Sequence, residues 1–278
     1  MTFSANGEYL LSSGLSQNVR VWRVQDGQRV ATIKANDVYC LAVSKNGKWI
    51  AGGMWDAPEV SVWDAKMHET VWKHREDYGD IYAVDFSPDS TTLVSGSWNH
   101  TATIWDVARG NKIHTLQHKR PVIAAKFSSD GYRIATATYE GSVRVWDNFG
   151  QLLVDIPVTV TSSYNAGLQW FNNRIFVVSG STIKQLRAST GSTVSEWPVP
   201  NSNSDSCIGI PRHGKFIACS TGRSVTFWDT STHLQIGLVK HTENIRSFAL
   251  SPDIRSLAIG GCYGTITTEG LSYIIVST

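Results

Sequence analysis

Five of the eleven tryptophans recur at nearly constant intervals along the 278-residue chain. They are Trp22, Trp63, Trp105, Trp146 and Trp228, and we call them the ladder tryptophans. The intervals are 41, 42, 41 and 82 residues, the last being twice 41, and all but the first tryptophan are followed by aspartate. A period of about 40 residues indicates a repeat architecture, in which each unit buries its apolar face against its neighbours.

A second motif, about 19 residues before the first four ladder tryptophans and present once more near the C-terminus, consists of an apolar residue, serine and a turn-forming pair. Its copies begin at Phe3, Val43, Phe86, Phe127 and Leu250. Asn-Gly and Asp-Gly pairs supply the positive φ angles of a tight hairpin turn. The segments between the turns are short and β-rich, and segments such as Val143–Trp146 alternate in polarity. Four short strands joined by tight turns predict antiparallel meanders, and stacked meanders predict an all-β propeller.

The number of repeats exceeds the number of ladder tryptophans. The long interval after Trp146 accommodates a repeat that keeps its β-rich segments but has Leu186 near the expected tryptophan position. A further copy follows Trp228, with its outer strand expected at residues 272–276. The sequence therefore predicts a single domain, a seven-bladed β-propeller of four-stranded antiparallel blades. The predicted blades span residues 1–34, 35–74, 75–117, 118–157, 158–199, 200–240 and 241–278.

Composition narrows the function classes. Hydrophobic residues make up 41% and charged residues 17% of the chain, which is typical of a folded core. The net charge is +2 and the basic residues are scattered, which argues against a nucleic-acid partner. The four cysteines form no C-x-x-C pair and suit a reducing compartment. The N-terminus does not read as a signal peptide, and no apolar run reaches the roughly 18 residues of a membrane helix. We expect a cytoplasmic or nuclear protein without a membrane partner.

Motifs of common enzymes are missing from the sequence. Gly14–Asn18 departs from a nucleophile elbow at its last position, and His68–Trp72 lacks the second histidine of a zinc helix. We therefore expect no catalytic residue, no cofactor and no metal. The alternative is a hydrolase or isomerase whose site lies at the central channel, because residues from several blades can converge there without a linear motif.

The fullest repeat, Ile81–Asp106, and the next one, Phe127–Asp147, resemble the WD40 repeat family. The resemblance implies a seven-bladed propeller that acts as a scaffold or adaptor for proteins or peptides and is a subunit of a larger complex. The family often links a histidine, a hydroxyl residue, a turn aspartate and the repeat tryptophan by hydrogen bonds. This implies a structural role for the ladder tryptophans, for His74 near Trp105 and for His118 near Trp146.

The resemblance also implies where a partner binds. In this family the loop between the second and third strands of a blade opens onto the top face. The residue before its turn aspartate often contacts partners. The residues at this position are expected to be Trp55, Trp98, Tyr139 and Tyr263. Segments that lead into the innermost strands add Tyr78, Asp80 and Lys119 to the same rim. Exposed aromatic residues are enriched at interface hot spots, although these rings could instead pack against neighbouring loops.

Overall fold

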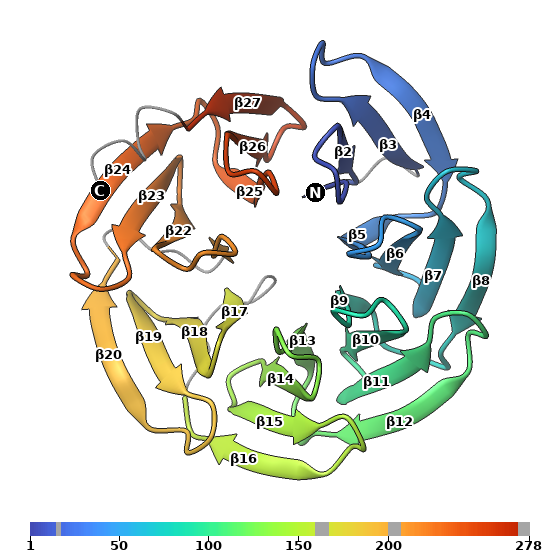
Figure 1. The fold of residues 1–278 in the computed structure, drawn as a ribbon. Helices are drawn as coiled ribbons and strands as arrows, with labels where there is room; N and C mark the ends of the chain where they lie inside the picture. Colours follow the sequence, from blue (N-terminus) through green and yellow to red (C-terminus); the bar gives the residue numbers. More distant parts are fainter. Residues whose placement is uncertain (15–17, 159–166, 200–206, 272–278) are drawn as a thin grey trace.

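The computed structural model describes residues 1–14, 18–158, 167–199 and 207–271. Seven antiparallel sheets stand side by side around a central axis (Figure 1). The chain runs outward through each sheet, from an innermost strand near the axis to an outer strand at the rim. The prediction of an all-β, seven-bladed propeller is confirmed.

The first four blades have four strands each. Their bounds are β1 (Thr2–Phe3), β2 (Tyr9–Ser12), β3 (Asn18–Arg23) and β4 (Arg29–Lys34); β5 (Val38–Val43), β6 (Trp49–Met54), β7 (Glu59–Asp64) and β8 (Thr70–Arg75); β9 (Ile81–Phe86), β10 (Thr92–Ser97), β11 (Thr101–Asp106) and β12 (Lys112–Gln117); β13 (Val122–Phe127), β14 (Arg133–Thr138), β15 (Val143–Asp147) and β16 (Leu152–Ile156).

The remaining three blades include the degenerate repeat. Leu186, at the missing tryptophan position, is fully buried and pairs with Ile175 in the fifth blade. The seventh blade has three strands within the described residues, and its predicted outer strand at 272–276 lies outside them. The bounds are β17 (Leu168–Phe171), β18 (Arg174–Ser179), β19 (Thr182–Arg187) and β20 (Thr193–Pro198); β21 (Ile208–Gly209), β22 (Phe216–Thr221), β23 (Ser224–Asp229) and β24 (Gln235–Lys240); β25 (Ile245–Leu250), β26 (Ser256–Gly261) and β27 (Ile266–Gly270).

The core lies between adjacent sheets. Trp105 of the third blade, for example, is fully buried among Val60 and Val62 of the second blade and Leu93 of its own. Each strand alternates the faces it presents to its two neighbours, which explains the alternating polarity of the sequence.

The serine of each turn motif closes the turn between the first two strands of its blade. In the fourth blade the Ser128 hydroxyl donates to the Asp130 carboxylate and accepts the Arg133 N–H, while Asp130 accepts the Tyr132 N–H. Gly131 follows with a φ of 77°. In the seventh blade Ile254 occupies the glycine position with a φ of 62°, which is costly for a β-branched residue.

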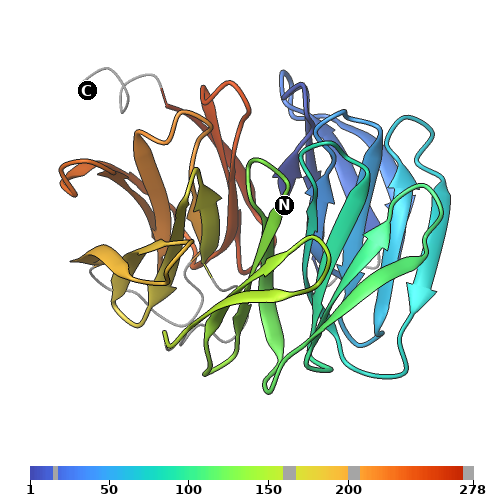
Figure 2. The same ribbon diagram turned by 60° about the horizontal axis from the view of Figure 1, so that its bottom comes forward.

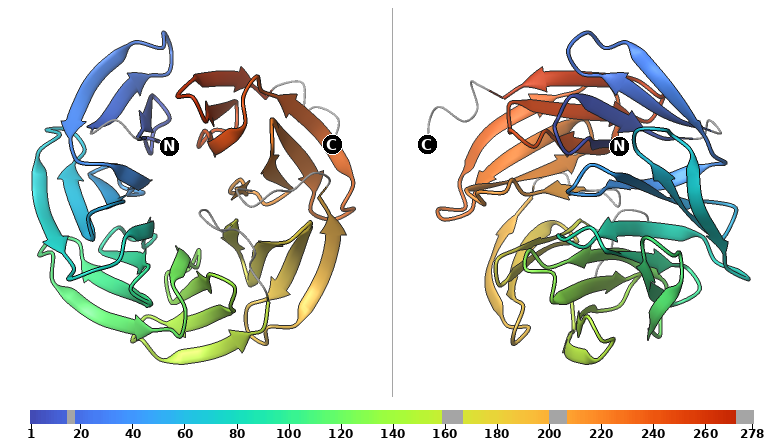
Figure 3. Two further views of the ribbon diagram at one scale, coloured as in Figure 1. Left: turned by 180° about the vertical axis from the view of Figure 1, so that it is seen from behind. Right: turned by 45° about the vertical axis from the view of Figure 1, so that its right-hand side comes forward.

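The strands run between two faces of the disc, so the turns gather on opposite faces (Figure 2). We call top the face that holds the loops between second and third strands and the connections between blades. The ring closes where the first blade meets the seventh (Figure 3). There Phe3 and Leu10 pack against Ala258, and Gly7 lies against Pro252.

Candidate binding surface

Five aromatic rings form a continuous row on the top face of blades two to four. Ring centroids lie 5.2 Å apart for Trp55 and Tyr39, 5.3 Å for Tyr39 and Tyr82, 5.3 Å for Tyr82 and Trp98, and 5.7 Å for Trp98 and Tyr139. The interplanar angles of 38–66° are those of edge and tilted contacts, which aromatic pairs favour. We call these five residues the aromatic row.

A repeated backbone hydrogen bond positions three members of the aromatic row. The N–H groups of Trp55, Trp98 and Tyr139 each donate over 2.9 Å to the residue just before the innermost strand of their own blade. The acceptors are the carbonyl oxygens of Asp37, Asp80 and Pro121. Because the same bond recurs in consecutive blades, the three rings occupy equivalent places and point into one region.

Tyr263 does not occupy the place that the sequence predicted. In the seventh blade the equivalent hydrogen bond runs from Cys262 N–H to the Asn244 carbonyl oxygen, over 2.9 Å. Tyr263 therefore corresponds to the turn position after the aromatic one, and it is 87% exposed at the tip of its loop. The prediction that Tyr263 is equivalent to Trp98 is wrong.

The rings of the aromatic row are partly packed and partly exposed. Trp55 and Trp98 keep 39% and 38% of their surface exposed, whereas Tyr82 keeps only 6%. Tyr39 and Tyr139 are half-buried. The buried rings hold the exposed ones in place, so the two alternatives left by the sequence, packing and exposure, both describe these residues.

The remaining predicted rim residues lie beside the row. The Asp80 carboxylate accepts the Asp56 N–H over 3.1 Å and so joins the loops of blades two and three. Tyr78 is 67% exposed in the connection that leads into β9. Lys119 is exposed in the next connection, where Arg120 approaches Glu140 at 3.8 Å. Glu140 therefore faces a rim cation and takes no part in the network around Trp146.

Tyr39 and Tyr82 were missed by sequence reasoning. Each is the second residue of an innermost strand, β5 or β9, directly after a buried aliphatic residue. An aromatic residue at this repeat position in two consecutive blades was the available signal.

Most ladder tryptophans are held by a hydroxyl group on the neighbouring inner strand or, for Trp228, on the same strand. The indole N–H donates to Ser12 from Trp22, to Ser95 from Trp105, to Thr136 from Trp146 and to Thr226 from Trp228, over 2.8–3.0 Å. The Trp63 N–H, by contrast, has no acceptor among the described residues. Gly52, which pairs with Ser61, stands where the third blade has Ser95.

His118 completes the network of the fourth blade. Its Nδ1 lies 3.0 Å from the Leu116 carbonyl oxygen and its Nε2 lies 2.8 Å from the Thr136 hydroxyl. The carbonyl can only accept, so Nδ1 carries the proton and Nε2 accepts from Thr136. Burial lowers the pKa of His118 to about 4. The side chain is therefore neutral at physiological pH and is a structural group.

The structure places His74 differently from the prediction. His74 lies on β8 of the second blade, and its ring packs 4.8 Å from the Trp105 ring without bonding to Ser95. His118 precedes Trp146 by 28 residues, and the residue 28 before Trp105 is Asp77. His74 thus supports Trp105 by ring contact from the neighbouring blade.

The described residues were compared with the requirements of a metal site and of a reactive thiol. In the described part of the chain no group of three or more His, Cys, Asp or Glu side chains is arranged to hold a metal ion. Cys40 is half-buried, and desolvation raises the pKa of its thiol to about 12, so the reactive thiolate is suppressed. Among the same residues, no helix has the length and apolarity needed to cross a membrane.

Comparison with known proteins agrees with the observed architecture. The profile of the family described as "IFT122 first beta-propeller" matches residues 1–269. WD repeat-containing protein 18 from Danio rerio is 24% identical over 275 residues, which cover 89% of this chain and 63% of that protein. Transcription initiation factor TFIID subunit 5 from Caenorhabditis elegans is 27% identical over 191 residues, which cover 67% of this chain and 29% of the relative. The chain spans less than two thirds of the length of either relative.

A solved structure shares the fold. A chain in the crystal structure of the mitotic checkpoint complex superimposes with a TM-score of 0.84 at 20% identity, over 96% of this chain and 85% of that one. At this identity the match describes the architecture alone.

Proposed function

The chain belongs to the WD40 repeat family, to the group described as the IFT122 first β-propeller, and from this membership we propose that it is a non-catalytic platform for protein or peptide binding. The contact surface is the top face of blades two to four. Trp55, Trp98 and Tyr139 provide its centre, with Asp80 and Lys119 at its edge.

The observation that carries this proposal is the aromatic row itself. A propeller fold needs its ladder tryptophans, but its hairpin turns do not require large rings. Here two tryptophans remain more than a third exposed on a rigid base of buried rings. Rigid, half-exposed aromatic side chains lose little conformational entropy on binding, which is why such residues dominate interface energies.

Charge around the row favours a partner with basic residues. Asp37, Asp56 and Asp80 lie next to the exposed tryptophans in sequence or by hydrogen bond. On the opposite side Arg120 is already close to Glu140, which leaves Lys119 as the nearby exposed cation. Carboxylates beside aromatic faces attract lysine and arginine side chains through Coulomb and cation–π interactions.

Membership in a larger complex is part of the same proposal. The relative from Caenorhabditis elegans is by its name a subunit of a transcription initiation factor. A ring of blades that exposes one aromatic surface provides a stable contact to another subunit without any catalytic group.

Alanine substitution of both exposed tryptophans tests the proposal. Trp55→Ala with Trp98→Ala should reduce affinity for a purified, captured partner by about 100-fold or more, because each is expected to be a hot spot worth about 2 kcal/mol. The melting temperature should change by only a few degrees. The matched control, Tyr132→Ala with Phe149→Ala, removes rings that are 69% and 76% exposed in turns of the opposite face.

Two outcomes would contradict the proposal. Equal loss of binding in both double variants would place the contact elsewhere or make it nonspecific. Unfolding of the Trp55 and Trp98 variant would show that these rings belong to the core.

A further inference from the structure

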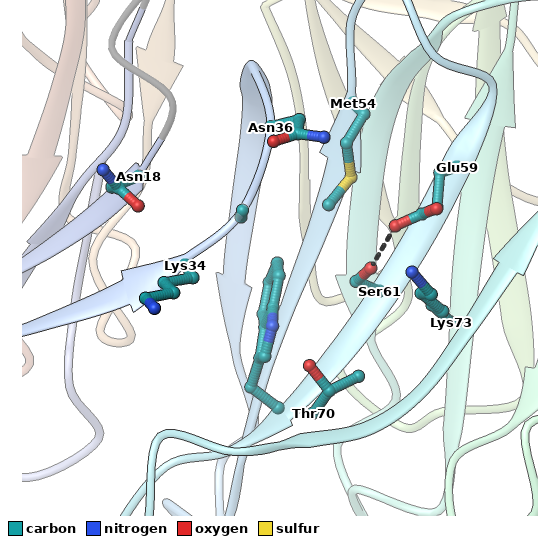
Figure 4. Close-up of a pocket in the computed structure, with 10 residues that line it drawn as sticks. Asn18, Lys34, Asn36, Met54, Glu59, Ser61, Thr70 and Lys73 are labelled. Carbon is teal, nitrogen blue, oxygen red and sulfur yellow. Dashed lines mark hydrogen bonds between the residues drawn. The ribbon is translucent and has the colours of Figure 1, made fainter.

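A polar cavity of about 390 Å³ lies between the first and second blades and shares no residue with the aromatic row. Its first wall is β3 and β4, its second wall is β7 and β8, and the connection through Asn36 and the end of β6 complete it (Figure 4). The volume is within the range of small-molecule sites, about 300–1,000 Å³. The lining residues are Asn18, Lys34, Ala35, Asn36, Met54, Glu59, Ser61, Trp63, Thr70 and Lys73.

The cavity exists because the second blade departs from the ladder pattern. A Cβ atom at position 52 would lie 2.8 Å from the Trp63 ring, so the glycine lets this ring lie directly against β6. The same glycine removes the hydroxyl that accepts the indole N–H of Trp105 in the next blade. Trp63 is only 2% exposed, lines the cavity and has no acceptor for its N–H in the described chain. The N–H is not among the enclosed polar atoms without a partner, so it opens onto the cavity and is available to an acceptor there.

The other donors of the cavity are not engaged by other side chains, and Lys34, Asn36 and Lys73 are exposed to solvent. Lys34 and Lys73 form no ion pair with any described residue, and the Asn18 and Asn36 amides have no hydrogen-bond partner there. Figure 4 shows Lys34 on the first-blade side and Lys73 on the second-blade side. Acceptors are fewer, because the carboxylate of Glu59 already accepts the Ser61 hydroxyl over 2.9 Å. The lining thus contains two lysines and one carboxylate, so the cavity carries a net positive charge.

We propose that this cavity binds an oxyanion, the carboxylate or phosphate group of a small molecule. The Trp63 N–H donates to one oxygen, and Lys34 and Lys73 neutralise the charge from the two walls. The asparagine amides provide further donors at the edge. An oxyanion can accept from several of these donors at once, and hydrogen bonds between charged groups and oxyanions are among the stronger ones.

Titration followed by the indole signal of Trp63 tests the site. Full-length protein labelled with ¹⁵N is titrated with inorganic phosphate in one arm and acetate in the other, at constant ionic strength. The Trp63 resonance is identified by its loss in Trp63→Phe. Should that variant not fold, NOEs from the ring to Gly52 identify it. We expect a saturable shift of this resonance that exceeds the shifts of the other indole signals.

Charge-neutral variants then test the roles of the lysines. Lys34→Gln and Lys73→Gln should each weaken binding roughly two- to five-fold, as expected for exposed charges, and the double variant should weaken it about tenfold. Lys48→Gln, an exposed lysine at the opposite end of β6, is the matched control and should not change affinity. A shift that does not saturate, or one equal in the double variant and the control, would show that the cavity holds only water and would overturn the proposal. A preference for phosphate over acetate, or the reverse, shows whether the cavity favours a phosphate group or a carboxylate group.

Discussion

At the scale of single residues, the indole N–H groups show which tryptophans only hold blades together. Trp22, Trp105, Trp146 and Trp228 direct this group to a hydroxyl within the blade. Such tryptophans are satisfied inside the fold and have no donor left for a ligand. Trp63 is the exception, and the reason is a single glycine at position 52.

His118 makes folding stability depend on pH. The unfolded chain takes up a proton near the ordinary histidine pKa of 6.5, whereas the folded chain resists protonation until about pH 4. The neutral, buried form is therefore fully stabilising above pH 6.5, and this contribution is lost as pH falls towards 4. Urea unfolding between pH 4 and 7 should show a decline of up to about 3 kcal/mol from this group. In His118→Gln the decline across this window should be smaller, and an unchanged slope would contradict the assignment.

At the scale of elements, the turn motif explains how each blade begins. The serine hydroxyl and the carboxylate or amide two residues later bond to one another and to the backbone. This arrangement fixes the hairpin independently of the glycine, which is why the turns at Ser90 and Ile254 form at positive φ without one.

Ser128→Ala measures what this arrangement contributes. The serine is 1% exposed, and its loss leaves the Arg133 N–H without its acceptor. We expect a decrease of about 1–2 kcal/mol in the free energy of unfolding at pH 7. Partial burial alone would raise the pKa of Asp130, but bonds from Ser128 and Tyr132 hold it below its usual 3.8. The ionised carboxylate of Asp130 thus stabilises the fold above that pH. The loss of unfolding free energy caused by Ser128→Ala should therefore shrink as pH falls below about 4. A cost that stays constant down to pH 3 would contradict this role.

The sequence was sufficient to predict the fold where a residue type favours one local backbone geometry. The turn motifs and the ladder predicted seven blades, including the one at Leu186, because turn chemistry and alternation are local. The position of Tyr263 was predicted wrongly because the loops between the second and third strands turn at different residues. The positive-φ residue directly follows Trp55 and Tyr139, as Asp56 and Glu140, but lies two residues after Trp98 and Cys262, as His100 and Gly264. The contacts of Tyr82 and the cavity beside Trp63 could not be predicted, since both depend on packing between blades.

At the scale of the whole molecule, the ring depends on contact between its first and seventh blades. This contact has a small core in which Phe3, Leu10 and Ala258 are at most 6% exposed. The other neighbouring blades are continuous in sequence, whereas within the described residues this pair is joined by side-chain packing. The aromatic row lies outside this contact, because its ring contacts are made within blades two to four.

Phe3→Ala tests this view of closure. Phenylalanine truncation in a core costs about 3–5 kcal/mol, and here the loss should appear first as faster hydrogen exchange in β1, β2, β25 and β26. Phe127→Ala, the same repeat position in the fourth blade and 7% exposed, is the matched control. Identical exchange patterns in the two variants would contradict this view. They would show that the contact between the first and seventh blades is as stable as the other contacts between blades.

Hydroxyl-radical footprinting of the protein with and without its bound partner tests the central proposal most directly. Oxidation of individual aromatic side chains reports their solvent access in the assembled state. We predict that Trp55, Trp98 and Tyr139 are protected in the complex while Tyr132 and Phe149 on the opposite face are oxidised as before. Protection of Tyr132 and Phe149 with continued oxidation of Trp55 and Trp98 would show that the partner binds the other face and would contradict the proposal.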